Sequence, residues 1–279
     1  MRGMKFEEKE IRVGDNLVSY VDEGADGSNT IVCIHGFPFN KWMWENQIDL
    51  LKENYRVIAY DVRGHGKSEA GTTQMSITQF TDDLFLFMDA LRIETTIICG
   101  LSMGGYIALN GVLSQPARIE ALILCDTQCG ADSDLTRKKR MDTIASVQKN
   151  GLRQYADDSV KKLFCENSLS HKPNEVLSIK QTILHTPVET ITTTLRALAD
   201  RKETCSRLHE INIPTMILVG ESDQITSPVQ ALKMRELIMG STLQIIEKAG
   251  HLSNLENPLA FNAHVQKFLT TIEQITKRL

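Results

Sequence analysis

The segment at residues 97–106 constrains the possible fold of this chain more than any other. An apolar run ends there in Gly-x-Ser-x-Gly, whose serine is Ser102, and a helical pattern from Tyr106 to Leu113 follows at once. A glycine turn between a buried strand and a helix forces the serine into a strained backbone and exposes its hydroxyl beside the positive end of the helix. Since glycine and serine are common residues, the motif alone is weak evidence for a nucleophile. Other parts of the chain have to supply its partners.

Composition and charge argue against several other classes of protein. The 279 residues are 42% hydrophobic and 24% charged, as in an ordinary globular protein, and the net charge of −4 gives no reason to expect nucleic acid or an anionic membrane as a partner. Residues Met1 to Glu10 are charged and lack the apolar region of a signal peptide. No apolar run approaches the roughly 20 residues that span a bilayer. We therefore expect a cytoplasmic protein without nucleic-acid or membrane partners.

The six cysteines indicate neither a disulfide framework nor a metal site. Cys33, Cys99 and Cys125 each lie in an apolar run typical of a buried strand, where a thiol packs as a small hydrophobic group. Cys125 and Cys129 are four residues apart, but no Cys-x-x-Cys pair or nearby histidine pair completes a zinc set. We expect reduced cysteines, no metal and no cofactor.

Short apolar runs alternate with helical patterns along most of the chain. Apolar runs of this kind are typical of strands buried on both faces, and their alternation with helices favours a parallel sheet. A turn at residues 14–16 indicates an antiparallel hairpin at the start. We predict an α/β fold with a mostly parallel eight-stranded sheet and helices on both faces. The predicted strands are 4–13, 17–22, 30–34, 56–60, 96–99, 121–125, 215–219 and 243–247, and the predicted helices beside them are 40–53, 76–91, 103–114, 228–239 and 258–276.

Residues 130–210 interrupt this alternation because they contain no strand-like run. A helical segment of this length is more than a crossover between parallel strands requires. We therefore predict a helical cap at 130–210, inserted into a core formed by residues 1–129 and 211–279. The basic run Arg137-Lys138-Lys139-Arg140 is expected to be a solvated helix face. The predicted cap helices are 135–149, 152–164, 175–184 and 189–198.

Candidate partners of Ser102 follow other predicted strands. In an open parallel sheet the ligand site lies at the carboxyl ends of the strands, so residues just after each strand meet at one edge. Asp223 follows the seventh strand and His251 the eighth. A neutral imidazole can take the proton of a serine hydroxyl, and a buried carboxylate on its other ring nitrogen fixes the tautomer and stabilises the imidazolium. The predicted set is nucleophile Ser102, acid Asp223 and base His251.

The loop at residues 35–38 offers an oxyanion site. Phe37 lies in this loop, which follows the third strand, and Met103 directly follows Ser102, so their backbone N–H groups are candidate oxyanion donors. The side chains of the same two residues are candidate substrate contacts. Asp126, directly after the sixth strand, remains an alternative to Asp223 as the acid.

Five motifs together resemble the α/β-hydrolase fold over nearly the whole chain. They are His-Gly-Phe-Pro at 35–38, Asp-Val-Arg-Gly-His-Gly-Lys-Ser at 61–68, Gly-Leu-Ser-Met-Gly-Gly at 100–105, Gly-Glu-Ser-Asp at 220–223 and Gly-His at 250–251. The resemblance implies a Ser102–His251–Asp223 triad, an oxyanion hole at Phe37 and Met103, and a cap over the substrate site. Within the family, the motifs are similar to those of small bacterial carboxylesterases and 3-oxoadipate enol-lactonase-like proteins.

The resemblance further implies a serine hydrolase that cleaves small carboxylic esters through an acyl-enzyme. A serine rather than an aspartate at position 102 argues against the dehalogenases and epoxide hydrolases of the same fold. Enol-lactones, or carbon–carbon bonds cleaved in aromatic catabolism, are alternative substrates, and a small-molecule sensor that retains the triad is a further alternative. An enol-lactone carboxylate would need a cation, for which Arg153 and Arg196 of the cap are candidates. The sequence does not indicate an oligomeric state.

Overall fold

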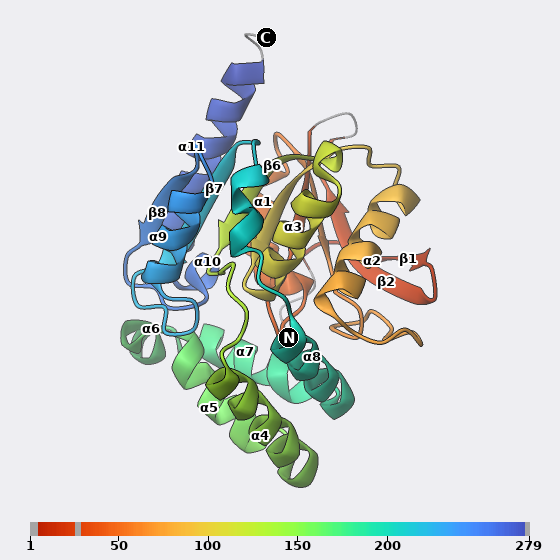
Figure 1. Ribbon diagram of the computed structural model, residues 1–279, viewed down its shortest axis with the longest axis vertical. Helices are drawn as coiled ribbons and strands as arrows, with labels where there is room; N and C mark the ends of the chain where they lie inside the picture. Colours follow the sequence, from red (N-terminus) through yellow and green to blue (C-terminus); the bar gives the residue numbers. More distant parts are fainter. Residues whose placement is uncertain (1–4, 26–28, 277–279) are drawn as a thin grey trace.

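The protein is built around a sheet of eight strands (Figure 1). A computed structural model describes residues 5–25 and 29–276. The strand order is β1-β2-β4-β3-β5-β6-β7-β8, in which β1 and β2 run antiparallel to their neighbours and the other strands are parallel. The predicted α/β class is therefore confirmed. The strands are β1 (Lys9–Val13), β2 (Asn16–Glu23), β3 (Thr30–Ile34), β4 (Arg56–Tyr60), β5 (Thr96–Leu101), β6 (Ile119–Cys125), β7 (Thr215–Gly220) and β8 (Thr242–Ile246).

The opening hairpin is tighter than its pattern predicts. The strand predicted from residue 4 begins at Lys9, and residue 4 itself lies outside the described residues. Val13 pairs with Asn16, so the turn consists of Gly14 and Asp15 alone. Gly14 has a φ of 58°, in the left-handed region that two-residue hairpin turns require and that glycine adopts without a steric penalty.

Helices cover both faces of the sheet, each over its own apolar core. These elements are η1 (Lys41–Trp44), α1 (Glu45–Leu51), α2 (Ile77–Ala90), α3 (Met103–Ser114), η2 (Pro116–Arg118), η3 (Cys205–Glu210), α9 (Pro228–Leu237), α10 (Ser253–Glu256) and α11 (Pro258–Thr276). One core joins the sheet to α2, α3 and α9 and includes Phe80, Ile107 and Met234, and the other joins it to α1 and α11 and includes Ile48 and Phe261. Among the described helices, none is long and apolar enough to cross a membrane.

Helices α4 to α8 lie together at one end of the sheet, on the side of the Ser102 turn (Figure 1). Four of them agree with the predicted helices to within two residues, whereas the short α6 was not predicted because it has no apolar repeat. The segment has a small apolar core of its own. That core comprises Ile144, Val147, Leu152, Ile191 and Leu195. The helices are α4 (Asp134–Asn150), α5 (Arg153–Leu163), α6 (Glu166–His171), α7 (Pro173–His185) and α8 (Val188–Asp200). The division of the chain into a cap at 130–210 and a core remains a prediction.

The expectation that no disulfide forms is wrong, because Cys129 and Cys205 are bonded. Cys129 follows β6 and Cys205 opens η3, so the bond joins the two ends of the helical segment where it leaves the sheet. The two residues are 76 positions apart in the sequence, but their Cα atoms are 4.8 Å apart. Sequence spacing could not reveal this pair because only the tertiary fold brings the ends of the segment together. The other four cysteines are free and buried.

Removing this bond is expected to destabilise the protein. The double variant Cys129→Ser/Cys205→Ser should lower the free energy of unfolding by about 2–4 kcal/mol, because the intact bond restricts the unfolded chain by closing a long loop. Urea unfolding followed by circular dichroism measures the change. A reductant should reproduce the loss in the wild type and have no further effect on the double variant. Equal stability of the oxidised wild type and the variant would contradict this role.

Candidate active site

Ser102 lies in the sharp turn between β5 and α3. Its backbone has a φ of 54° and a ψ of −109°, a conformation that is costly for a residue other than glycine. The glycines around it permit the turn, since a Cβ on Gly100 would lie 2.4 Å from the carbonyl oxygen of Gly104, and a Cβ on Gly104 would lie 2.1 Å from that of Ile34. The hydroxyl of Thr127 donates a hydrogen bond to the Ser102 carbonyl at 2.8 Å. The close packing at Gly100 and Gly104 and the hydrogen bond from Thr127 together hold the turn in this conformation.

His251 lies between Ser102 and Asp223. Its Nε2 is 2.9 Å from Ser102 Oγ, and its Nδ1 is 2.8 Å from Asp223 Oδ2. The Asp223 carboxylate also accepts hydrogen bonds from the backbone N–H groups of Ile225 and Thr226 and from the Thr226 hydroxyl. With the Nδ1 proton directed at the carboxylate, Nε2 is left to accept the serine proton. The structure therefore brings together the three residues that the sequence analysis singled out as nucleophile, base and acid.

Asp126, the alternative acid, is fully buried but makes different contacts. It accepts a hydrogen bond from the Gly220 N–H at 2.8 Å and another from the hydroxyl of Ser253. No hydrogen bond joins it to the His251 ring among the described residues. Burial, with the nearby Asp223 carboxylate as a second cause, raises the pKa of Asp126 well above its usual value. Asp126 therefore links the ends of β6 and β7 to α10, and Asp223 is the carboxylate on the imidazole.

The His251 imidazole and the Asp223 carboxylate each favour the charged form of the other. Burial alone would lower the pKa of His251 and raise that of Asp223. Their close contact outweighs burial because each charge stabilises the other. As a result, the pKa of His251 lies above its usual 6.5, and the pKa of Asp223 lies well below its usual value. The carboxylate is therefore ionised at neutral pH and can stabilise an imidazolium.

The raised pKa of His251 sets an expected pH dependence. Only a neutral imidazole can take the serine proton, so kcat/KM should fall as the pH falls through the pKa of His251, with a midpoint above 6.5. Above that midpoint the base is neutral and activity is retained. The measurement is kcat/KM for a p-nitrophenyl ester across the neutral range. An acidic limb with its midpoint below 6.5 would contradict the stabilisation of the imidazolium by Asp223.

The loop after β3 is held in place by His35. The Nδ1–H of His35 donates a hydrogen bond to the Gly36 carbonyl at 2.8 Å, and its Nε2 accepts one from the N–H of Val62 at 2.9 Å. Burial lowers the pKa of His35 to about 4, so its ring is neutral and occupied on both nitrogens. Within the described residues, the backbone N–H groups of Phe37 and Met103 make no hydrogen bond. Both are therefore available as donors beside the Ser102 turn.

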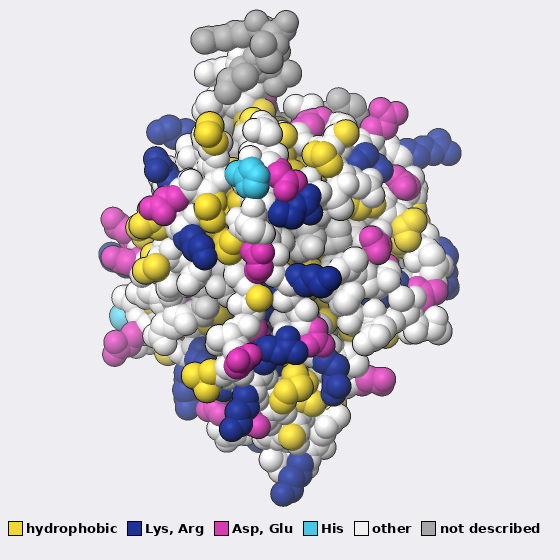
Figure 2. Space-filling model, viewed as in Figure 1, with side chains coloured by type: hydrophobic (Ala, Val, Ile, Leu, Met, Phe, Trp, Pro, Cys, Tyr) yellow, Lys and Arg dark blue, Asp and Glu magenta, His cyan; other side chains and the backbone are white. Residues whose placement is uncertain are grey.

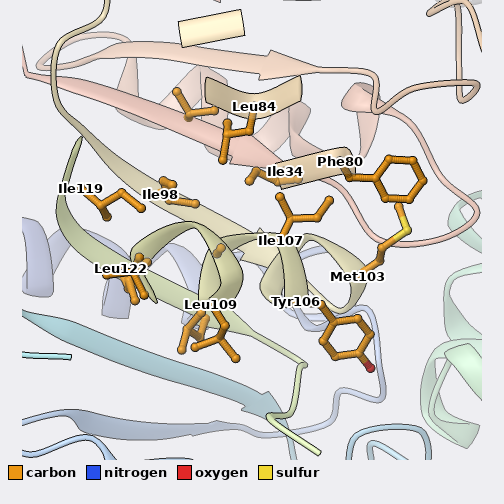
Figure 3. Close-up of a cluster of buried hydrophobic side chains, with 14 of the residues drawn as sticks. Ile34, Phe80, Leu84, Ile98, Met103, Tyr106, Ile107, Leu109, Ile119 and Leu122 are labelled. Atoms are coloured by element: carbon orange, nitrogen blue, oxygen red, sulfur yellow. The ribbon is translucent and has the colours of Figure 1, made fainter. Parts of the chain in front are cut away.

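A cavity of about 260 Å³ opens at Ser102, between the sheet and helices α4 and α5. Phe37 and Met103, the candidate substrate contacts, both line it. Met103 is also part of the sheet core, where its side chain points toward Phe80 (Figure 3). The volume suits a small molecule. The lining residues are Phe37, Pro38, Ser102, Met103, Tyr106, Thr136, Lys139, Arg140, Thr143, Tyr155, Ser159, Lys162, Leu163, Leu195, Leu198, Ile225 and His251.

The cations that line this cavity are not the two named from the sequence. Arg196 lines a separate hollow, and Arg153 belongs to the lining of neither. Lys139 and Arg140 of α4 and Lys162 of α5 line the cavity instead. Two residues of the basic run thus face the cavity rather than forming only a solvated surface.

Across residues 5–25 and 29–276, no group of three or more His, Cys, Asp and Glu side chains is arranged to hold a metal ion.

Glu256, which the sequence analysis did not single out, ties the His251 loop to helix α6. Its buried carboxylate accepts hydrogen bonds from the N–H groups of the residues on either side of His251 and from the N–H of Cys165. The N–H of His251 in turn donates to the Leu163 carbonyl at 2.8 Å. The sequence signal for Glu256 was weak, because it is one acidic residue near a histidine and its third donor comes from a distant part of the chain.

Known proteins share this architecture. The family model of the alpha/beta hydrolase fold matches residues 29–258, so the chain belongs to that family. The 3-oxoadipate enol-lactonase 1 of Acinetobacter baylyi is 28% identical over 250 residues, which cover 90% of this chain and 92% of that protein. The structure of a thermophilic esterase from Thermogutta terrifontis, with malate bound, has a TM-score of 0.90 at 28% identity and covers 95% of this chain and 99% of its own. The enol-lactonase from Burkholderia xenovorans LB400 has a TM-score of 0.88 at 27% identity and covers 94% of this chain and all of its own.

Proposed function

We propose that this protein is a serine hydrolase of small carboxylic esters that works through an acyl-enzyme on Ser102. The observation that carries the proposal is the pair of contacts at His251, 2.9 Å to Ser102 Oγ and 2.8 Å to Asp223 Oδ2. Membership of the hydrolase family and the esterase and enol-lactonase relatives support the same reaction class. No residue set for a metal or cofactor is needed for this chemistry.

The first half of the reaction forms the acyl-enzyme. Ser102 Oγ attacks the ester carbonyl carbon while His251 Nε2 takes the serine proton. The carbonyl oxygen becomes an oxyanion, to which the N–H groups of Phe37 and Met103 donate hydrogen bonds. The proton on Nε2 then passes to the alcohol oxygen as the carbon–oxygen bond breaks. The alcohol leaves, and the acyl group stays on Ser102.

The second half of the reaction restores the enzyme. Water attacks the acyl carbon while His251 Nε2 takes one of the water protons. The same N–H groups stabilise the second oxyanion. When the bond to Ser102 Oγ breaks, the proton on Nε2 returns to that oxygen, and the carboxylic acid product leaves the cavity.

An enol-lactone is the second candidate substrate, because the same steps open a lactone ring and keep both products in one molecule. The relatives named as enol-lactonases favour it, with 28% identity for the Acinetobacter baylyi protein and 27% for the Burkholderia xenovorans structure. Carbon–carbon bond hydrolysis and a sensor role that retains the triad stay open as predictions without a comparable observation in their favour.

A substrate panel tests the proposal. Short p-nitrophenyl esters, an enol-lactone and a vinylogous 1,5-diketone are supplied separately, and rapid quenching followed by peptide mass spectrometry searches for an acyl group on Ser102. The proposal predicts steady turnover of the esters and acylation of Ser102. Faster turnover of the enol-lactone would select the second candidate. Saturable binding without turnover or acylation would favour the sensor and overturn the hydrolase proposal.

We also propose a small-molecule substrate and action without a nucleic-acid or membrane partner. A cytoplasmic location stays a prediction. The Cys129–Cys205 disulfide argues against a cytoplasmic location, because disulfides persist mainly in oxidising compartments.

A further inference from the structure

We propose that the substrate of this site carries a carboxylate, which Arg140, Lys139 and Lys162 bind at the cap end of the cavity. The inference rests on the proposed function, since it concerns the same cavity. It narrows the substrates to half-esters of dicarboxylic acids and to lactones that bear a carboxylate side chain.

The charge of the cavity wall is one-sided. Among the lining residues, Lys139, Arg140 and Lys162 are cations, and none is an aspartate or a glutamate. The rest of the wall includes apolar side chains such as Phe37 and Leu195. Lys139 and Lys162 are exposed and Arg140 is partly buried, so water and salt partly screen the attraction between these cations and a bound anion. The cavity still favours an anionic ligand over a neutral or cationic one.

Helical spacing directs these cations into the cavity. On α4 the lining residues are Thr136, Lys139, Arg140 and Thr143, which follow the i, i+3, i+4, i+7 pattern of one helix face. On α5, Ser159 is followed three positions later by Lys162. Two polar helix faces thus meet across the cavity. Figure 2 shows Lys and Arg side chains, with acidic ones among them, over the part of the surface where α4 and α5 lie in Figure 1.

Arg140 is positioned by a buried carboxylate. Asp132 lies between Arg140 and Arg201, with contacts of 2.5 Å to the Nε of Arg140 and to the Nη1 of Arg201. Although burial opposes it, the two guanidinium groups lower the pKa of Asp132, so the carboxylate is ionised. One negative charge cannot neutralise two positive charges, so the cluster keeps an excess positive charge. Arg201 also stacks over the ring of Tyr106, which lines the cavity, at 4.4 Å from the ring centre.

The lysines of the cavity differ from basic neighbours on the same helices. Arg137 pairs with Asp200 at 2.7 Å, and Lys161 with Asp158 at 4.0 Å. In the described parts of the chain, neither Lys139 nor Lys162 has an ion-pair partner. Their charges are therefore available to a ligand.

The position of the cations fixes the shape of the substrate. Ser102 comes from the sheet end of the cavity, whereas the cations come from α4 and α5 of the helical segment. The scissile carbonyl and the carboxylate must therefore lie at opposite ends of the molecule, separated by a short apolar chain or ring. A mono-ester of glutaric acid meets these conditions, and the pentanoate ester differs from it only by a terminal methyl group in place of the carboxylate.

The test compares p-nitrophenyl hydrogen glutarate with p-nitrophenyl pentanoate on a matched pair of variants. Lys139→Gln/Lys162→Gln removes the two cavity lysines. Lys138→Gln/Lys161→Gln removes two charges from the same helices at positions that do not line the cavity. The ratio of kcat/KM for the anionic ester to that for the neutral ester should fall about tenfold in the first variant and less than about twofold in the second. Added salt should lower the same ratio in the wild type.

A ratio that stays constant in Lys139→Gln/Lys162→Gln, or falls equally in both variants, would overturn the inference. Calorimetric titration of glutarate into the Ser102→Ala protein separates this failure from a failure of the proposed function. If neither ester is hydrolysed but Lys139→Gln/Lys162→Gln weakens glutarate binding about tenfold, the result supports the anion site and contradicts the hydrolase proposal. If both esters are hydrolysed but the lysine substitutions change neither the kcat/KM ratio nor glutarate binding, only the proposed anion site is wrong.

Discussion

Replacing Ser102 with alanine is expected to lower kcat for a p-nitrophenyl ester by about five to six orders of magnitude. Ser102 Oγ is the atom that forms the acyl bond in the proposed reaction, and it lies 2.9 Å from the Nε2 that takes its proton. Without it, His251 has no hydroxyl to activate, and only the oxyanion donors and the cavity remain. Steady-state release of p-nitrophenol, with peptide mass spectrometry for acylation, measures the effect.

Ser222→Ala is the matched control for this experiment. Ser222 is exposed and lies beside Asp223, and its side chain makes no hydrogen bond within the described residues. The control removes a hydroxyl from a neighbouring loop without touching the His251 contacts, so kcat should change less than about twofold. If Ser102→Ala keeps more than a tenth of the wild-type kcat, the hydrolysis proceeds at another group and the acyl-enzyme proposal is wrong.

Replacing Asp223 with asparagine is expected to lower kcat by about four orders of magnitude. An asparagine preserves the shape of the side chain, but it cannot hold the Nδ1 proton of His251 or stabilise the imidazolium. The Asp223 carboxylate lies 2.8 Å from that nitrogen and is held by the N–H groups of Ile225 and Thr226. Folding should be little affected, since the buried volume is unchanged. Thermal unfolding and kcat, measured on the same preparation, separate the two effects.

Asp126→Asn is the paired variant that decides which carboxylate is the acid. Because the pKa of Asp126 is raised well above its usual value, the neutral carboxylic acid is favoured there, and asparagine resembles that form. The variant should therefore lose less than about tenfold in kcat. If Asp126→Asn removes more activity than Asp223→Asn, the assignment of Asp223 is incorrect.

Much of the architecture could be predicted because strands buried on both faces leave a clear pattern. The unbroken apolar runs of β5 and β7 correspond to strands that are buried along their whole length. The turn residues after such strands are then the natural candidates for a site, since the ends of parallel strands meet at one edge. This reasoning predicts Ser102, Asp223 and His251 as members of one site, and the structure places the His251 side chain within hydrogen-bond distance of the other two.

Other features could not be read from local patterns because they depend on distant parts of the chain. The Cys129–Cys205 bond joins residues whose neighbours give no sign of pairing. Charge alone makes Arg153 and Arg196 candidates, but the cavity is lined by Lys139 and Lys162. The packing of α4 and α5 within the helical segment decides which face of each helix is turned toward the cavity. The available sequence signal is the run of four consecutive basic residues at 137–140, which by itself predicts a solvated helix face.

The hydrogen bonds around Glu256 limit how this protein can be recombined with its relatives. Exchanging the helical segment for that of another family member is an obvious route to a new substrate range. The Leu163 carbonyl and the Cys165 N–H belong to that segment, yet they hold the loop that carries His251. Because both are backbone groups, a graft that replaces all of α4 to α8 would keep this support of the proposed base only if it reproduced the backbone path at residues 163–165. The selectivity of the cavity can be redesigned through side chains of α4 and of α5 up to Lys162, whereas the backbone conformation at residues 163–165 has to be retained with the sheet.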